Sequence, residues 1–170
     1  MGVVSKIGFG GSCHWCTEAI FQSLKGVAAV EQGWIASEGE ASSFSEAVIV
    51  HFNAAIISLQ TLIAIHLHTH SCTSKHHMRS KYRSAVYTFE ENQVEPAKAA
   101  LVVLQNDFDD KIITEVIPFA EFKLNSEDYL NYYYSNPRKP FCENVVGPKL
   151  RSLLQNFSNH IDQKKLKASD

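Results

Sequence analysis

Apolar and polar residues along the chain follow two periods, one typical of strands and one of helices, and the two alternate in a definite order. Residues 3–9 form a β-branched, apolar run that predicts a strand. Apolar residues then recur at helical spacing until Lys25-Gly26 provides a stop signal. The complete pattern predicts strands at 3–9, 27–35, 46–52, 84–89 and 112–117, and helices at 15–24, 59–66, 95–106, 126–136 and 148–157.

The first six of these elements predict the fold. They run strand, helix, strand, strand, helix, strand, which is the order of the split βαβ unit in a ferredoxin-like α+β sandwich. A chain of 170 residues with 45% hydrophobic content can bury one good core. We therefore expect a two-layer sandwich with additional helices, forming a single catalytic domain at 1–160 with a polar C-terminal tail at 161–170.

Charge and composition narrow the classes of partner. The formal net charge is −2 and the isoelectric point is near 6.4, without a basic stripe, so neither nucleic acid nor an anionic membrane surface is an expected partner. No apolar run approaches the length of a membrane span, and Met1 to Phe9 contains no hydrophobic signal region. We expect a cytoplasmic protein, whose four cysteines would be kept reduced.

The most informative motif is Cys13-His14-Trp15-Cys16, which follows a Gly10-Gly11-Ser12 turn and opens the first predicted helix. Unpaired backbone N–H groups and the positive end of the helix dipole favour a thiolate at such a position. Small residues before the cysteine let a substrate approach the backbone. This pattern indicates that Cys13 is a nucleophile.

The other cysteines are candidates for a second thiol. Cys16 lies on the first turn within reach of Cys13, and it is equally well explained as a packed core thiol. Cys72 lies in a polar loop and Cys142 in a proline-flanked loop, so we expect both to be accessible. The pattern leaves Cys16, Cys72 and Cys142 open as partners of Cys13.

Strand parity also singles out a carboxyl. Glu46 shares its side of the predicted strand with Val48, Val50 and Phe52. A carboxyl near apolar walls tends to stay protonated, so Glu46 could donate a proton to a substrate oxygen. The alternative is a residue at a strand end whose carboxylate reaches water.

Histidines between residues 66 and 77 form a second unusual cluster. Five histidines and Cys72 occur within twelve positions, and both residue types are zinc or copper ligands. The spacing fits no standard zinc finger, and there is no second cysteine pair. We expect no metal site, and a metal or redox sensor is kept as an alternative.

Several segments together resemble one family, the A-class peptide methionine sulfoxide reductases. Residues 10–18 resemble its Gly-Cys-Phe-Trp signature, and residues 33–36 its Gly-Tyr-Ala-Gly turn. Residues 45–48 fall where its Gly-His-Ala-Glu strand begins, and residues 80–84 are similar to its Gln-Tyr-Arg-Ser motif. Residues 129–137, 140–142 and 148–150 resemble the carboxyl-terminal portion of many bacterial members, so the match extends from about Phe9 to Phe157.

The resemblance implies an α+β sandwich with added helices and reduction of the S-epimer of methionine sulfoxide, in proteins or free. It implies recycling by thioredoxin, or by dithiothreitol in its place, with no bound cofactor. It also implies that Cys13 is the nucleophile, that Glu46 is the proton donor to the sulfoxide oxygen, that Tyr82 is a hydrogen-bond partner of that oxygen, and that Trp15 holds the S-methyl group.

This chain departs from the family pattern at three expected substrate-binding positions. His14 replaces the pocket phenylalanine, Trp34 stands for the pocket tyrosine, and His77 stands where an aspartate precedes the Tyr82 motif. A histidine can donate a hydrogen bond, and its charge changes near neutral pH. Substrate preference and pH optimum are therefore expected to differ from the family's.

A thioredoxin-like dithiol oxidoreductase is the main alternative enzyme. A strand, a turn and a C-x-x-C motif at a helix start also describe that fold. Two consecutive predicted strands follow the first helix, however, and Glu46 has no counterpart in a thioredoxin-like protein. The order of the elements therefore favours the sulfoxide reductase.

Overall fold

The computed structural model describes residues 4–135, 147–162, 164 and 165, and these form a six-stranded sheet in the order β5-β4-β1-β3-β2-β6. The strands are β1 (Val4–Gly10), β2 (Val27–Ala36), β3 (Ser45–Asn53), β4 (Ala85–Thr88), β5 (Glu115–Pro118) and β6 (Glu121–Leu124). Neighbouring strands are antiparallel except β4 and β5, which are parallel. The central order β4-β1-β3-β2 is that of the predicted split βαβ unit, so the α+β expectation is confirmed.

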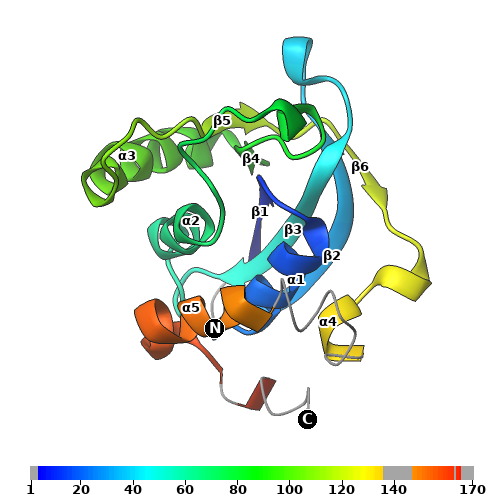
Figure 1. Cartoon of the computed structure of the whole chain (residues 1–170), viewed down its shortest axis with the longest axis vertical. Coiled ribbons are helices and arrows are strands. Elements are labelled where there is room, and N and C mark those ends of the chain that lie inside the picture. The colour runs from blue at the N-terminus through cyan, green and yellow to red at the C-terminus, as the bar shows by residue number, and fades with distance from the viewer. Residues whose placement is uncertain (1–3, 136–146, 163, 166–170) are drawn as a thin grey trace.

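The helices are α1 (His14–Gln22), α2 (Leu59–His68), α3 (Val94–Leu104), α4 (Tyr132–Ser135) and α5 (Gly147–Phe157) (Figure 1). Side chains of α1 and α2 join one face of the sheet in the main core, in which Phe9 of β1 stacks on Phe21 of α1 with ring centroids 4.7 Å apart. The opposite face carries a smaller cluster around Tyr87 and Ile35. The two layers are therefore held mainly by the helix-covered face.

Alternation along β3 explains how this strand serves both faces. Val48 and Val50 belong to the main core, whereas Ala47 and Ile49 belong to the smaller cluster. Full burial of an aliphatic side chain of this size contributes about 1.5–3 kcal/mol. The same alternation sets the direction of Glu46 at the beginning of the strand.

Two sequence predictions about the later elements differ from the structure, one in the type of element and the other in its bounds. The helix expected at 126–136 is replaced by a short 3-10 turn at Glu127–Tyr129 and by α4, because Asn131 between them adopts a left-handed φ of 55° that ends any continuous helix. The expected strand at 112–117 is displaced to β5, and β6 follows it without having been predicted. Both strands have only four residues, so their alternation is too short to identify.

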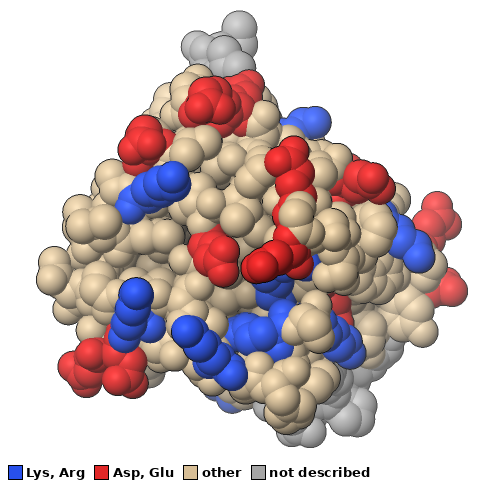
Figure 2. All heavy atoms as spheres, turned by 90° about the horizontal axis from the view of Figure 1, so that it is seen from above, with Lys and Arg blue, Asp and Glu red and all other residues tan. Residues whose placement is uncertain are grey.

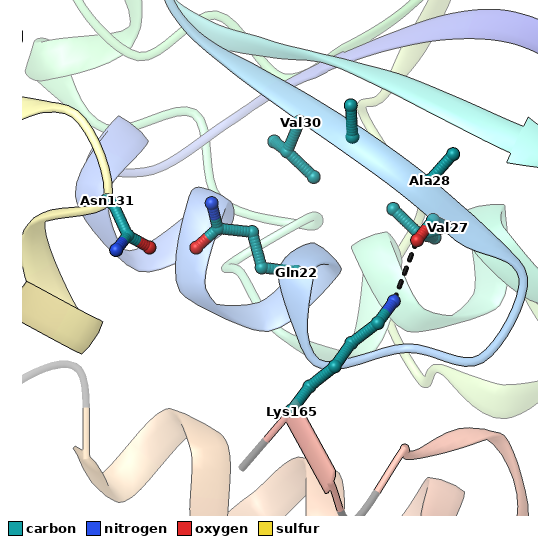
Figure 3. Close-up of a pocket in the computed structure, with 7 residues that line it drawn as sticks. Gln22, Val27, Ala28, Val30, Asn131 and Lys165 are labelled. Atoms are coloured by element: carbon teal, nitrogen blue, oxygen red, sulfur yellow. Dashed lines mark hydrogen bonds between the residues drawn. The ribbon is translucent and has the colours of Figure 1, made fainter. Parts of the chain in front are cut away.

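The end of the described chain packs against the turn between α1 and β2. Ile161 is buried and forms an isolated bridge with Leu24. The Nζ of Lys165 donates to the carbonyl oxygens of Leu24 and Val27, each at 2.7 Å, and Figure 3 shows the second of these bonds. Part of the expected polar tail at 161–170 thus contacts the domain, and the boundary at residue 160 stays a prediction.

Charge and hydropathy of the described chain add two observations. None of its helices has the length and apolar composition needed to cross a bilayer. Acidic and basic side chains both occur on the face shown in Figure 2, with the basic ones gathered mostly in the lower half of the view. This face therefore carries no uniform field of one sign.

Candidate active site

The turn between β1 and α1 places Cys13 at the beginning of a helix. Cys13 is the N-terminal capping residue of α1, and its carbonyl oxygen accepts the N–H groups of Cys16 at 3.1 Å and Thr17 at 3.2 Å. Backbone N–H groups at a helix N-terminus, together with the helix dipole, favour a negative charge there. As the sequence predicts, the thiol lies where a thiolate is stabilised.

Glycine is required at position 11 of this turn. Gly11 has φ of 151°, and a Cβ atom there would lie 2.5 Å from Cδ2 of His70. The His70 ring is held in place because its Nε2 lies 2.8 Å from the Oγ of Ser84. A side chain at position 11 would therefore collide with a fixed imidazole.

Two further side chains hold the turn from the α2 side and from the following loop. The Nε2 of His66 donates to the carbonyl oxygen of Gly10 at 2.7 Å. The Nη1 of Arg79 donates to the carbonyl oxygens of Gly11 and Tyr82, each at 2.8 Å. Arg79 therefore links the turn before Cys13 to the segment that carries Tyr82.

Histidines of the segment at 66–77 make structural contacts, two of them at the turn before Cys13. His66 and His70 hold the turn as described, and the Nε2 of His68 lies 3.0 Å from a carboxylate oxygen of Asp107. Within the described residues, no three His, Cys, Asp or Glu side chains come together as metal ligands. The metal-sensor alternative therefore has no support from these residues.

Acidification should destabilise the protein through His66. Burial holds the pKa of His66 well below its ordinary value. Below about pH 6.5, His66 is therefore protonated in the unfolded chain but stays neutral in the folded chain. The free energy of unfolding is thus not reduced by His66 above this pH, and it decreases as the pH falls below it. In urea unfolding, His66→Gln should lose less stability than wild type between pH 7 and 5, by up to about 1.4 kcal/mol per pH unit. Equal slopes for the two proteins would contradict this expectation.

The thiol of Cys13 is half-buried and electrostatically activated. A hydrogen bond from the Cys16 thiol lowers the pKa of Cys13 most strongly, and backbone N–H groups of Trp15 and Cys16 lower it further. Burial and the nearby Glu46 charge act in the opposite direction, and the net pKa is lowered. A lowered pKa is the property expected of a reactive cysteine.

Cys13 opens into a cavity of about 420 Å³ with a mixed polar and aromatic lining. Pockets of this kind, apolar with a few placed polar groups, are typical ligand sites. The lining residues are Cys13, His14, Trp15, Trp34, Glu46, Lys81, Tyr82, Asn125 and Tyr129.

Several elements contribute to the cavity. Trp34 near the end of β2 and Glu46 near the start of β3 are paired across the two strands. The chain after β6 runs back to α4 beside α1, and it supplies Asn125 and Tyr129 (Figure 1). The site therefore depends on contacts between segments that are far apart in the sequence.

Glu46 is buried at one wall, with only 6% of its surface exposed. Its Oε1 accepts the backbone N–H of His14 at 3.2 Å, and its Oε2 lies 3.5 Å from the Nζ of Lys81. This geometry contradicts the alternative of a carboxylate that reaches water. It also corrects the expectation of apolar walls, because an imidazole and an ammonium group face the carboxyl.

His14 and Trp34 form the adjoining wall. The His14 ring is buried, and its Nδ1 lies 2.8 Å from the carbonyl oxygen of Gly33. It contacts Trp34 edge to face, with ring centroids 5.1 Å apart. Burial is the largest cause that lowers the pKa of His14.

An aromatic stack forms the rim on the α1 side. Trp15 stacks on Tyr132 with centroids 4.2 Å apart and on Tyr129 with centroids 5.5 Å apart. The buried carboxylate of Glu18 accepts the backbone N–H groups of Asn131 and Tyr132 and so holds the start of α4 against α1. The contact of Glu18 with the start of α4 therefore helps to fix the position of Trp15, which stacks on Tyr132.

Four predicted site residues need separate treatment. His77 is exposed in a 3-10 turn (His77–Ser80) and does not line the cavity, because this turn directs Lys81 and Tyr82 inward instead. Cys72, expected to be accessible, is 2% exposed in the main core, and burial raises its pKa. Cys16 is fully buried beside Cys13. Cys142 lies outside the described residues.

Sequence reasoning missed three lining residues. The sequence does not mark Lys81 as a site residue, because its proximity to Glu46 depends on the loop conformation. Asn125 and Tyr129 follow the unpredicted β6. Nothing local in the sequence marks Asn125, whereas the aromatic content around Tyr129 was the one available signal.

A second cavity, of about 320 Å³, lies where Lys165 crosses the α1–β2 turn (Figure 3). It is lined by Gln22, Val27, Ala28, Ala29, Val30, Asn131 and Lys165. These residues include no thiol, imidazole or carboxyl. Of these two cavities, the one at Cys13 is the one lined by a thiol, an imidazole and a carboxyl.

Comparisons with known proteins agree with one another. Residues 5–162 match the family model described as peptide methionine sulfoxide reductase. The peptide methionine sulfoxide reductase MsrA of Pasteurella multocida is 32% identical over 155 residues, covering 83% of this chain and 89% of the relative. MsrA of Psychrobacter sp. (strain PRwf-1) is 30% identical over 167 residues, covering 89% of this chain and 95% of the relative.

Solved structures show the same fold. The reduced form of Mxr1 from Saccharomyces cerevisiae has a TM-score of 0.71 at 20% identity, covering 82% of this chain and 89% of that chain. Mxr1 in complex with Trx2 has a TM-score of 0.59 at 18% identity, covering 76% and 84%. The family match overturns the thioredoxin-like alternative. This chain belongs to the A class of the peptide methionine sulfoxide reductase family.

Proposed function

We propose that the chain carries out its family's reaction, the reduction of methionine sulfoxide, with Cys13 as nucleophile and Glu46 as proton donor. One observation carries this proposal: a thiol with a lowered pKa and a buried carboxyl line the same cavity. A sulfoxide bound there meets a sulfur nucleophile and an acid together, and oxygen transfer needs both.

The remaining walls suit the side chain of an S-sulfoxide, either in a protein or in free methionine. Tyr82 would donate a hydrogen bond to the sulfoxide oxygen. Trp15 would contact the S-methyl group, with Trp34 and His14 completing the pocket. Aromatic faces contribute apolar contact, and the polar groups orient the oxygen.

In the first step, the Cys13 thiolate attacks the sulfoxide sulfur while Glu46 gives its proton to the sulfoxide oxygen. The S–O bond of the substrate breaks, the oxygen passes to Cys13 with the proton, and methionine leaves. Cys13 becomes a sulfenic acid. The electron pair lost by the Cys13 sulfur is the pair gained by the substrate sulfur, and Glu46 is left as a carboxylate.

Cys16 is the second thiol favoured by the structure. Cys16 and Cys72 are both buried in the core and neither lines the cavity, but the Cys16 thiol donates a hydrogen bond to the Cys13 sulfur from the same helical turn. The Cys16 sulfur would attack the sulfenic acid, forming an S–S bond and breaking the S–O bond. The hydroxyl leaves as water with the proton of the Cys16 thiol.

A dithiol must then reopen this disulfide. Since Cys16 is fully buried and Cys13 is partly exposed, the incoming thiolate would attack the Cys13 sulfur first. The complex of Mxr1 with Trx2 supports a thioredoxin as this dithiol, and dithiothreitol would replace it in vitro. Dependence on such a reductant fits a cytoplasmic protein that carries no bound cofactor.

Single-turnover chemistry tests these roles. With excess methionine sulfoxide and no reductant, wild type should release about one methionine per chain and lose the thiols of Cys13 and Cys16. Cys16→Ala should also release about one methionine, but its Cys13 should be labelled by dimedone, a reagent for sulfenic acids. Under dithiothreitol, turnover of this variant should be slower than that of wild type.

Cys72→Ala is the matched control, because it also removes a buried thiol from the core. It should behave as wild type in methionine release and in thiol loss. A peptide map showing Cys13 joined to Cys142 or to Cys72 in oxidised wild type would contradict the role of Cys16. Absence of any methionine release would contradict the role of Cys13.

A further inference from the structure

His14 directs one ring nitrogen at a carbonyl and the other into the cavity. Its Nδ1 lies 2.8 Å from the carbonyl oxygen of Gly33 on β2. A carbonyl oxygen can only accept a hydrogen bond, so Nδ1 carries a hydrogen. In the neutral ring, Nε2 therefore has a free lone pair and acts as an acceptor.

The second ring nitrogen lies close to Glu46. The Nε2 of His14 lies 3.4 Å from the Oε1 of Glu46, and both residues are buried, with 4% and 6% exposed surface. The Nδ2 of Asn125 is 3.5 Å away on another side, at the outer limit of a hydrogen bond. A neutral imidazole and an ionised carboxylate would thus place two acceptors close together in a buried site, and one proton between them removes this repulsion.

We propose that His14 and Glu46 share one proton, and that His14 is a positioning residue that keeps the proton of the reaction available to Glu46. This inference rests on the proposed function, in which Glu46 protonates the sulfoxide oxygen. It also gives a role to the departure from the family signature, because the phenylalanine expected at this position has no lone pair to accept a proton.

The charged neighbours of the imidazole come from several elements. Burial lowers the pKa of His14 most strongly, the Gly33 carbonyl and the Glu46 charge raise it, and the Lys81 charge lowers it, so that the net pKa is lowered and the ring favours its neutral form. Lys81, from the segment before β4, approaches the other carboxyl oxygen of Glu46 at 3.5 Å. The remaining titratable groups that line the cavity are Cys13, Tyr82 and Tyr129.

The pair formed by Glu46 and His14 regains its proton in the step that regenerates Cys13. A dithiol that opens the Cys13–Cys16 disulfide becomes a disulfide itself and brings two hydrogens. One hydrogen stays on Cys16, and the other is released as a proton because Cys13 departs as a thiolate. The proton removed from Glu46 in the first step is thereby returned to the pair formed by Glu46 and His14.

A pH–rate profile tests the shared proton. Methionine S-sulfoxide turnover by wild type and His14→Phe would be measured from about pH 5 to about pH 9. Phenylalanine supplies an aromatic ring but cannot bind the proton. The alkaline limb of the profile should therefore shift to lower pH by about one unit or more. This corresponds to an approximately tenfold loss at an alkaline pH with little change in the acid range. Superimposable alkaline limbs would overturn the proposal.

A second measurement keeps His14 in place. Imidazole ¹⁵N spectra of the inactive Cys13→Ser protein should show His14 with its hydrogen on Nδ1, and the signals should titrate with the alkaline limb of wild type. Glu46→Gln should displace this titration, because a glutamine cannot share the proton. A His14 ring with hydrogen only on Nε2 would overturn the proposal, even if His14→Phe failed to fold.

The matched control is another histidine–carboxyl pair outside the cavity. The Nε2 of His51 lies 2.7 Å from the Oε2 of Glu31 at a half-exposed site on β2 and β3. His51→Phe should leave the pH profile unchanged, and a shift as large as that of His14→Phe would overturn the assignment to His14. If the His14 tests fail while Cys13→Ser and Glu46→Gln are inactive, only the proposal of a shared proton is contradicted, and the proposed function stands.

Discussion

Cys13→Ser should reduce the turnover of a dabsylated methionine S-sulfoxide, with dithiothreitol as reductant, to the background rate. A serine hydroxyl stays protonated at neutral pH and is a far poorer nucleophile than a thiolate at this helix N-terminus. Loss of a covalent nucleophile lowers the turnover rate by at least about 10³-fold. The measurement is initial rate at saturating substrate, with circular dichroism to establish that the variant is folded.

The control for Cys13→Ser is Cys72→Ser, which exchanges a sulfur that does not line the cavity. Its turnover should stay close to that of wild type. Alkylation by iodoacetamide gives an independent readout, because the lowered pKa of Cys13 predicts half-maximal reactivity at a lower pH than for an ordinary cysteine. Equal turnover by wild type and Cys13→Ser would remove Cys13 from the mechanism.

Glu46→Gln should lower the turnover rate by about 10²-fold or more, the scale of a positioned general acid. Glutamine has nearly the same shape, and its side-chain oxygen can still accept the backbone N–H of His14. It cannot release a proton to the sulfoxide oxygen, so the chemical step should slow with little change in KM. Rates from rapid-quench single turnovers would separate this step from reoxidation and recycling.

Glu31→Gln is the corresponding control, since Glu31 is also paired with a histidine but lies outside the cavity. Its rate should match that of wild type within experimental error. An unchanged rate for Glu46→Gln would mean that another group protonates the oxygen, with His14, Lys81, Tyr82 and Tyr129 as the other proton-bearing groups that line the cavity.

The early elements could be predicted because their patterns are long and uninterrupted. The nine-residue strand β3 alternates between the two faces of the sheet, and this alternation predicts the direction of Glu46 from the sequence alone. By contrast, β6 has four residues and is held only by pairing with β2. A strand that exists through a distant partner leaves little trace in its own composition.

The site residues differ in the same way, because some are placed by local sequence and others by long-range contacts. Cys13 and Trp15 follow from one local motif, so their places could be inferred from neighbouring residues. Lys81 and His77 could not be placed, because the loop that holds them takes its shape from Arg79, which donates to the carbonyl oxygens of Ser71, Ser74, Gly11 and Tyr82. Such a network of long-range bonds decides which side of a loop faces inward.

The placement of both sulfurs on the first turn of α1 has a thermodynamic consequence. A disulfide stabilises a protein mainly by restricting the unfolded chain, and the restriction grows with the length of the loop that it closes. A bond between Cys13 and Cys16 closes only a single helical turn. Formed in the proposed cycle, this bond would stabilise the folded chain by about 2 kcal/mol, less than a disulfide that closes a long loop. The oxidised form should therefore resist heat somewhat better than the reduced form.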